Sequence, residues 1–332
     1  MGEIAIFAPI YKNAMTKNLI YTLVCSVFLI LVCSCERASF PESLLTRAGV
    51  PTEVQRDFFE RNGSDIRITD AGYIPSSSGI SYSSGERAYV HFVDRTGLSC
   101  KSEYLNGRWQ LTLREYDCDD PIRHLPRPVA NAVRLLDFEP YLPFRESDRV
   151  VEYTRQGFDH KYYEFSFHTQ LGPDHYAQHY LLIDEQGSVL EDANSYFNCM
   201  DNSVNYGEAL SFIAARYPGC DVRGLANDSG YDTFYIFHEG RLKRVRFENH
   251  FQVQYPTAAE GWKETVWRLD GPQEVPDYVW AEFQMRNEKT AENNRYQATD
   301  YFYLETPRDC YFGLGGPASG TILTISWYTD RG

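Results

Sequence analysis

The sequence has few positively charged side chains and none of the short motifs that mark common enzyme classes. Lysine and arginine number 32 against 46 aspartates and glutamates, which gives a formal net charge of −14 at pH 7. Nucleic-acid binding requires cationic side chains that neutralise phosphates, so this balance argues against a nucleic-acid partner. The chain also lacks the G-x-S-x-G, P-loop, dinucleotide-binding and H-E-x-x-H patterns. We therefore predict no catalytic residues, no cofactor and no metal site.

The cysteines do not form a metal or redox motif either. No pair has C-x-x-C spacing, which weakens zinc and thioredoxin-like interpretations. In an oxidising compartment disulfides are permitted, and Cys100 and Cys118 fall on neighbouring predicted strands, so we predict a bridge between them. A bridge between Cys199 and Cys220 is a second candidate. The alternative is that these cysteines are buried free thiols that pack as small apolar side chains.

The N-terminal residues 1–35 are typical of a targeting segment. Lys17 precedes an apolar run from Leu19 to Val32, which suits the apolar region of a secretory signal and is short for a membrane span. The run ends in Leu31-Val-Cys-Ser-Cys35, the pattern of a bacterial lipobox. We predict cleavage before Cys35 and lipidation of that cysteine, with an ordinary cleaved signal or a membrane anchor as the alternative. Met15 gives the segment a more usual signal length than Met1 does.

A lipid on Cys35 would hold a folded domain at a membrane, because several acyl chains anchor far more firmly than one. We therefore expect a membrane-anchored lipoprotein of the bacterial cell envelope, at the outer membrane, with its membrane contact made through Cys35.

A repeated apolar-proline motif organises the rest of the chain. Val50-Pro51, Leu125-Pro126 and Val275-Pro276 each open a short amphipathic stretch, and a weaker copy without the proline runs over 204–217. Apolar residues recur in these stretches at helical spacing. The predicted helices cover residues 52–61, 127–136, 207–217 and 277–286.

Aromatic, alternating segments follow each predicted helix and predict strands. Tyrosine, phenylalanine and tryptophan make up 15% of the chain, a composition that favours sheet. Asn106-Gly107, set between two strand-like runs, is a strong hairpin signal. We predict an α+β fold of tandem repeats, each with one short helix plus about four antiparallel strands, paired into larger sheets. The predicted segments are the signal with its lipobox (1–35), a tether (36–49), and four repeats (50–120, 121–203, 204–272 and 273–332).

The apolar-proline motifs and one turn resemble the PepSY-like family, also described as β-lactamase-inhibitor-protein-like (BLIP-like), of bacterial envelope lipoproteins. The resemblance covers most of residues 50–328, although the third copy lacks the proline and the fourth lacks the Asp-x-x-Gly turn. It implies paired repeats of helix and antiparallel sheet, and it implies no catalytic residues. The matching residues are Val50-Pro51-Thr-Glu-Val54, Leu125-Pro126-Arg-Pro-Val129, Val275-Pro276-Asp-Tyr-Val279 and Asp184-Glu-Gln-Gly187-Ser-Val189.

Two polar clusters could hold a metal, but their patterns fit other roles better. Four histidines gather in the second repeat without the spacing of a zinc-protease helix, and we interpret them as solvated strand residues. Three aspartates precede that repeat without the glycine and glutamate of a calcium-binding loop, and we interpret them as a charged linker. Trp262 and Trp267 are interpreted as core residues, with a role in a binding face as the alternative. The two polar clusters are His160, His168, His175 and His179, and Asp117, Asp119 and Asp120.

These observations favour a non-catalytic binding or inhibitor-like module over an enzyme. Its partner would be a protein, a peptide or a glycan, and the excess of acidic residues favours a basic one, because complementary potentials speed encounter. The alternative function is a hydrolase or metal-dependent enzyme on the same scaffold, because the spatial distance between two carboxylates cannot be read from sequence separation.

Overall fold

The computed structural model describes most of the chain after the predicted targeting segment. The predicted lipidation site Cys35, the first part of the tether and Cys118 lie outside the described residues. Among the helices that are described, none has the length and hydropathy needed to cross a membrane. The described residues are 44–76, 85–116, 121–136, 149–172, 175–193, 197, 199, 206–228, 230–248, 257–290, 300–315 and 322–327.

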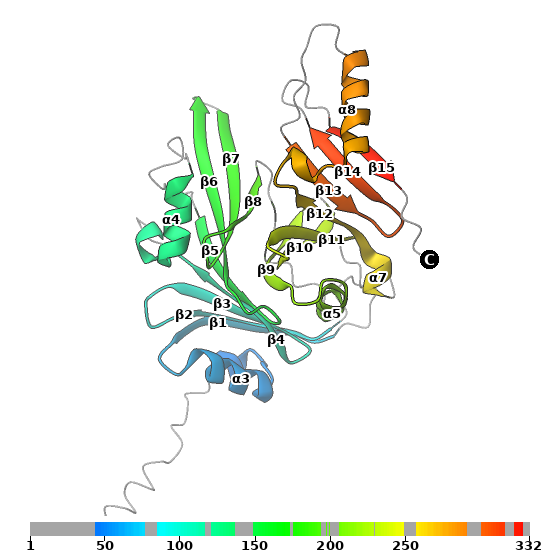
Figure 1. Cartoon of the computed structure of the whole chain (residues 1–332). Coiled ribbons are helices and arrows are strands. Elements are labelled where there is room, and N and C mark those ends of the chain that lie inside the picture. The colour runs from blue at the N-terminus through cyan, green and yellow to red at the C-terminus, as the bar shows by residue number, and fades with distance from the viewer. Residues whose placement is uncertain are drawn as a thin grey trace, which may run out of the picture.

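Two antiparallel sheets form the fold (Figure 1). The first sheet has eight strands in the order β1-β2-β3-β4-β5-β6-β7-β8, and the second has seven in the order β15-β14-β13-β12-β11-β10-β9. Within each sheet, every strand therefore pairs with its neighbours in the chain. The strands of the first sheet are β1 (Arg67–Ile74), β2 (Arg87–Val93), β3 (Ser99–Leu105), β4 (Arg108–Glu115), β5 (Arg149–Arg155), β6 (Tyr162–Gly172), β7 (His175–Asp184) and β8 (Val189–Ala193). Those of the second are β9 (Asp221–Asp228), β10 (Tyr231–His238), β11 (Arg241–Glu248), β12 (Trp262–Arg268), β13 (Asp300–Glu305), β14 (Cys310–Gly315) and β15 (Ile322–Trp327).

A helix precedes each run of strands, which confirms the predicted α+β repeats of one helix plus about four antiparallel strands. The strand sets β1–β4 and β5–β8 join into one sheet, as the pairing of repeats predicts. The four predicted helices are present, and the last continues to Thr290, beyond the predicted end at 286. The long helices are α3 (Thr52–Asn62), α4 (Arg127–Leu135), α5 (Gly207–Arg216) and α8 (Asp277–Thr290). Shorter turns are α2 (Leu44–Arg47), η1 (Pro121–His124), α7 (Ala258–Gly261) and η3 (Pro272–Glu274).

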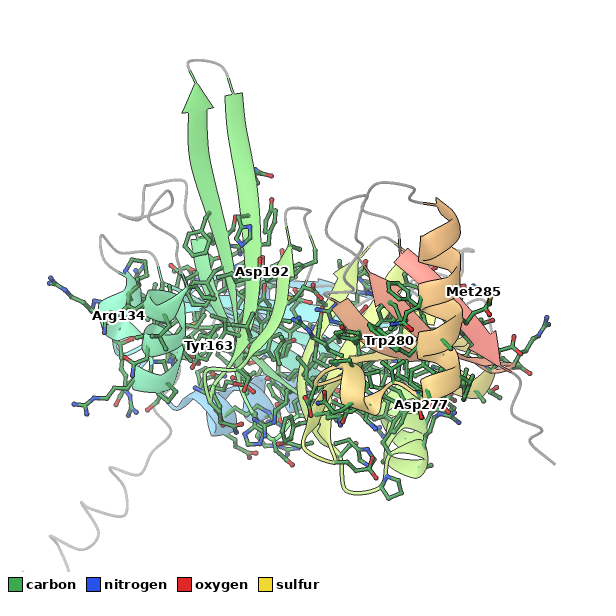
Figure 2. All side chains as sticks on the ribbon, turned by 45° about the horizontal axis from the view of Figure 1, so that its top comes forward. Arg134, Tyr163, Asp192, Asp277, Trp280 and Met285 are labelled. Atoms are coloured by element: carbon green, nitrogen blue, oxygen red, sulfur yellow. The ribbon has the colours of Figure 1, made fainter. Side chains whose placement is uncertain are left out.

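Each long helix buries its apolar stripe against the strands that follow it. In α3, Val54 and Phe58 are almost fully buried, and the Phe58 ring meets Phe92 of β2 edge-to-face at 5.1 Å. On α8, Trp280 lies on the sheet side and packs near Tyr301 of β13 (Figure 2). Helices this short are marginal alone, so each one depends on its sheet and forms a cooperative block with it.

The faces without helices bring the two sheets together. Strands β4 to β8 present buried side chains on the face away from α4, and these pack against Ala226 of β9 and Tyr235 of β10. Gly224 of β9 lies at the closest approach, where a Cβ atom would stand 2.6 Å from Leu190 Cδ1. The absence of a side chain at Gly224 therefore lets the second sheet approach β8.

A charged cluster closes the same junction at its solvent edge. Arg223 of β9 forms two ion pairs. Its Nη1 lies 3.0 Å from Asp184 Oδ2, at the end of β7, and its Nε lies 2.6 Å from Asp221 Oδ2. His160 places Nδ1 2.7 Å from Glu185 Oε1 and Nε2 3.2 Å from Asp221 Oδ2. His160 therefore contacts carboxylates from both halves of the molecule, and the hydrogen bond to Glu185 raises its pKa above the ordinary value.

We expect His160→Gln to destabilise the protein only at acidic to neutral pH. Because the folded-state pKa of His160 is raised, its contribution is fully present below the ordinary value of about 6.5 and is lost as the pH rises through the raised value. The difference in free energy of unfolding between wild type and variant should be largest near pH 6 and vanish near pH 9. It should stay below about 1 kcal/mol, because the side chain is partly exposed and screened by solvent. Urea titrations across this range measure it, and a difference independent of pH would contradict the assignment.

Candidate binding groove

A groove of about 580 Å³ lies where β8 of the first sheet runs past the second sheet. Figure 1 shows β8 on the side of the first sheet that faces the second sheet, and Figure 2 shows Asp192 on that side. Three strands of the second sheet form the opposite wall. The lining residues are Val189, Leu190, Glu191, Asp192, Leu242, Arg244, Val266, Trp267, Arg268, Tyr301 and Phe302.

The β8 wall of the groove is the edge of a strand. Four successive residues, Val189 to Asp192, line the groove. Successive side chains of a strand point to opposite faces of the sheet, so a wall made of consecutive residues is formed by the strand's edge. β8 is the last strand of its sheet, and among the described residues it pairs only with β7.

The opposite wall belongs mainly to one face of the second sheet. In the β11–β12 register, Arg244 stands opposite Val266, and these two share the face turned toward β8. Their neighbours Lys243 and Trp267 belong to the other face, where Trp267 packs against the α8 core. Along β11, the helix-covered face therefore carries Lys243, Val245 and Phe247, and the groove face carries Leu242 and Arg244.

Phe302 adds an aromatic surface to this wall. Its ring covers Gly313 of the paired strand β14, where a Cβ atom would lie 1.8 Å from Phe302 Cζ. Only glycine leaves room for this ring position. An aromatic ring laid over a cross-strand glycine also shields the backbone that the glycine would expose.

Glu191 links the two walls. The Tyr235 hydroxyl donates to Glu191 Oε2 at 2.7 Å, and Arg244 Nη2 lies 3.2 Å from Glu191 Oε1. Burial and the nearby carboxylate raise the pKa of Tyr235 well above its ordinary value, so the hydroxyl remains a donor. Asp192 is engaged separately, 2.8 Å from His179 Nε2. The groove thus combines an apolar and aromatic surface with a few fixed charged groups.

Two smaller hollows lie on the first sheet, and their lining residues come from strands β1 to β5. Their volumes are about 180 and 160 Å³, and both include Lys101 in their lining. Tyr89 and His91 stack edge-to-face at 5.5 Å beside them. The groove beside β8 is more than three times larger, so it is the stronger candidate site.

The predicted cysteine bridges have different outcomes. Cys100 is buried on β3, and burial raises the pKa of its thiol to about 11. Because Cys118 lies outside the described residues, the bridge between them stays a prediction. Cys199 and Cys220 are both free, which contradicts the second candidate bridge. Cys199 lies in the core between the sheets, whereas Cys220 packs beside the α5 core.

The histidines do not form one site in the described part of the chain. His160 lies in the charged junction, and His179 is paired with Asp192 beside the groove. The side chains of His168 and His175, and the predicted linker aspartates, lie outside the described residues. Across the residues that are described, no three histidine, cysteine or carboxylate side chains converge as metal ligands. Trp262 is 4% exposed, which confirms its interpretation as core, whereas Trp267 is partly buried against the α8 core and also lines the groove.

Sequence reasoning did not find the groove, because its two walls come from different repeats. One signal was present: Arg244 and Arg246 alternate with Val245 and Phe247, which indicates a strand with one charged face. The position of β8 opposite that face depends on how the sheets pack, and no local pattern reports it.

Comparison with known proteins finds similar solved structures, and two of them are Bacteroides proteins. No protein-family model matches the chain, and no curated protein matches it. A candidate periplasmic protein from Bacteroides eggerthii DSM 20697 is similar at 12% identity and a TM-score of 0.30, over 43% of this chain and 87% of that one. A BLIP-like protein from Bacteroides fragilis NCTC 9343 is similar at 14% identity and a TM-score of 0.29, over 43% of this chain and 84% of that one. The likeness to BLIP-like proteins expected from the apolar-proline motifs is thus found at low sequence identity.

Proposed function

We propose that this protein is a non-catalytic binding or inhibitor-like module of the bacterial cell envelope, and that the groove beside β8 is its contact surface. The observation that carries the proposal is the groove itself. Its volume of about 580 Å³ falls in the range of about 300–1,000 Å³ typical of binding sites. Its mixture of apolar surface with few, positioned polar groups is also typical of such sites.

The polar groups of the groove support binding more than bond-making chemistry. Glu191 is held by a tyrosine hydroxyl and a guanidinium, and Asp192 faces His179. A general acid or base must be able to exchange a proton with a reacting group within hydrogen-bond reach. These carboxylates are already held by side chains of the protein. We therefore assign them to the shape of the groove and to its specificity for a ligand, and not to proton transfer.

The location at the envelope rests on the lipobox that ends at Cys35. In this proposal the lipid holds the described domain at the membrane. The net charge of −14 favours a partner with a basic surface. Such steering should weaken as salt rises, because the Debye length falls.

A pair of photo-crosslinking variants tests the contact surface. A photoreactive phenylalanine analogue replaces Phe302 in the groove or, as the control, Tyr278, which is 58% exposed on α8. After irradiation of intact cells, we expect a discrete crosslinked product from position 302 and not from position 278. Identical products from both positions, or a product from 278 alone, would contradict the assignment of the groove. Turnover of a substrate by the purified protein would favour the enzyme alternative.

A further inference from the structure

We infer that the groove takes an extended peptide segment of a protein partner, which adds to β8 as a ninth strand of the first sheet. This inference rests on the proposed function and names the class of partner. Strand addition at an open sheet edge obtains its affinity from backbone hydrogen bonds and its specificity from pockets for alternate side chains. The groove supplies both components.

The backbone of β8 provides the hydrogen-bonding edge. Its inner side pairs with β7 through Tyr180–Ala193, Leu181–Asp192 and Leu182–Glu191. Backbone N–H and C=O groups of an edge strand alternate in direction, so every second residue of this run points its groups away from β7. In the described chain no turn, loop or strand bonds to that outer side.

A bulge limits the pairing to a short run. Ile183 pairs with Val189 and Leu182 with Glu191, so Leu190 is the extra residue, and its side chain is 1% exposed. Bulges in edge strands disfavour indiscriminate pairing. The regular outer edge therefore spans Glu191 to Ala193, roughly 10 Å at about 3.4 Å per residue. A peptide bound there needs side-chain contacts to gain affinity, which is what the opposite wall offers.

The opposite wall selects the side chains. An added strand beside β8 directs alternate side chains toward a wall in which Leu242, Val266 and Phe302 are apolar or aromatic. Arg244 and Arg268 add charge to the same wall, and Arg244 is already paired with Glu191. On β8 itself, Asp192 keeps a side chain that is 52% exposed. A lysine or arginine placed across from it would form a favourable cross-strand pair. The expected ligand is an extended segment with apolar or aromatic residues at every second position and one basic residue.

Selection of displayed peptides followed by backbone methylation tests strand addition. A displayed library of random nonapeptides is selected on the purified lipid-free chain, with the Phe302 photo-crosslinking variant used to confirm that each selected peptide lies in the groove. Each amide of the best peptide is then N-methylated in turn. We expect methylation at alternate positions of a three- to five-residue run to weaken binding at least about tenfold, because a hydrogen bond and the close strand approach are both lost. Methylation at the intervening positions should change Kd less than about threefold, because those amides point away from β8.

The outcomes separate this inference from the proposed function. Peptides that crosslink at position 302 but show no alternation in the methylation scan would overturn strand addition and leave the groove as the contact surface. A library that yields no groove-binding peptide would also overturn strand addition, whereas the whole-cell crosslink would still report on the groove. An alternating scan that also loses affinity when Asp192→Lys is introduced would support the edge strand and the basic ligand residue together.

Discussion

Phe234→Ala lowers the free energy of unfolding by about 3–5 kcal/mol, the largest single effect expected from a core truncation here. Phe234 on β10 is fully buried and meets the rings of Tyr206 and Phe247 edge-to-face, each at 5.6 Å. It also stacks on Phe158 from the first half of the chain at 6.4 Å. Removal of the ring leaves a cavity at the point where the halves meet, so both should lose stability together. Urea denaturation followed by circular dichroism measures the change.

The matched control lies three positions along the same strand. Phe237 is 42% exposed, so Phe237→Ala removes little buried area and should cost less than about 1 kcal/mol. Equal losses from the two variants would contradict the assigned face of β10. A wild-type protein that unfolds in two separate transitions, only one of which Phe234→Ala shifts, would show that the halves are not coupled through this ring.

Glu152→Ala costs about 3 kcal/mol, because a buried carboxylate holds several partners in place. Glu152 on β5 is 5% exposed and accepts hydrogen bonds from Tyr116 at 2.7 Å, Tyr163 at 3.3 Å and Lys161 at 2.7 Å. Arg114 Nη1 lies 3.5 Å from Glu152 Oε1, the oxygen that also accepts from Lys161. Without the carboxylate, two buried hydroxyls lose an acceptor, whereas the two cations can turn toward solvent. Because the two cations can be solvated, the expected loss of unfolding free energy lies at the low end of the range for a broken buried ion pair.

The pH dependence of the Glu152 effect has a defined sign. Burial alone would raise the pKa of Glu152, but hydrogen bonds from Lys161 and Tyr116 and the Arg114 charge lower it below the ordinary value. A lowered folded-state pKa contributes stability above the ordinary value of about 4.3 that is lost as the pH falls through the lowered one. The difference in unfolding free energy between wild type and Glu152→Ala should therefore shrink below about pH 4.

Glu115→Ala is the control. The Glu115 side chain is 38% exposed and has one ion pair, to Arg149, so this substitution should cost less than about 1 kcal/mol. Similar losses for the two glutamates would refute a special role for the buried one.

The local features of the fold could be predicted from the sequence because each has a local cause. Asn106 and Gly107 both have positive φ, 50° and 74°, as the predicted tight hairpin turn requires. Pro126 precedes α4 directly, and Val129 and Val133 are its buried positions, in agreement with the apolar-proline motif. The end of α8 was misplaced because helix ends depend on capping, and residues 287–290 have no helix-breaking residue among them.

The groove and the junction between the sheets could not be predicted for a different reason. Glu191 meets Arg244 and Tyr235 only after two separate sheets have packed. The sequence pattern of β8 does not indicate β10 or β11 as its neighbours, and their patterns do not indicate β8. Gly224 illustrates the problem: a lone glycine in a strand signals close approach of some neighbour, but not which one. Residue pairing between repeats is the information that a single sequence lacks.

The meander order of both sheets has a consequence for how the chain acquires its structure. Because every strand within a sheet pairs with its neighbour in the chain, most native pairings close short loops, and the relative contact order is low for so much sheet. The exceptions are the β4–β5 and β12–β13 pairings, which must wait for the connections carrying α4 and α8 to close. Single hairpins should therefore form early and in any order, and these two closures should set the folding rate. A polypeptide emerging unfolded from a membrane would then expose unpaired strand edges mainly while α4 and α8 are docking.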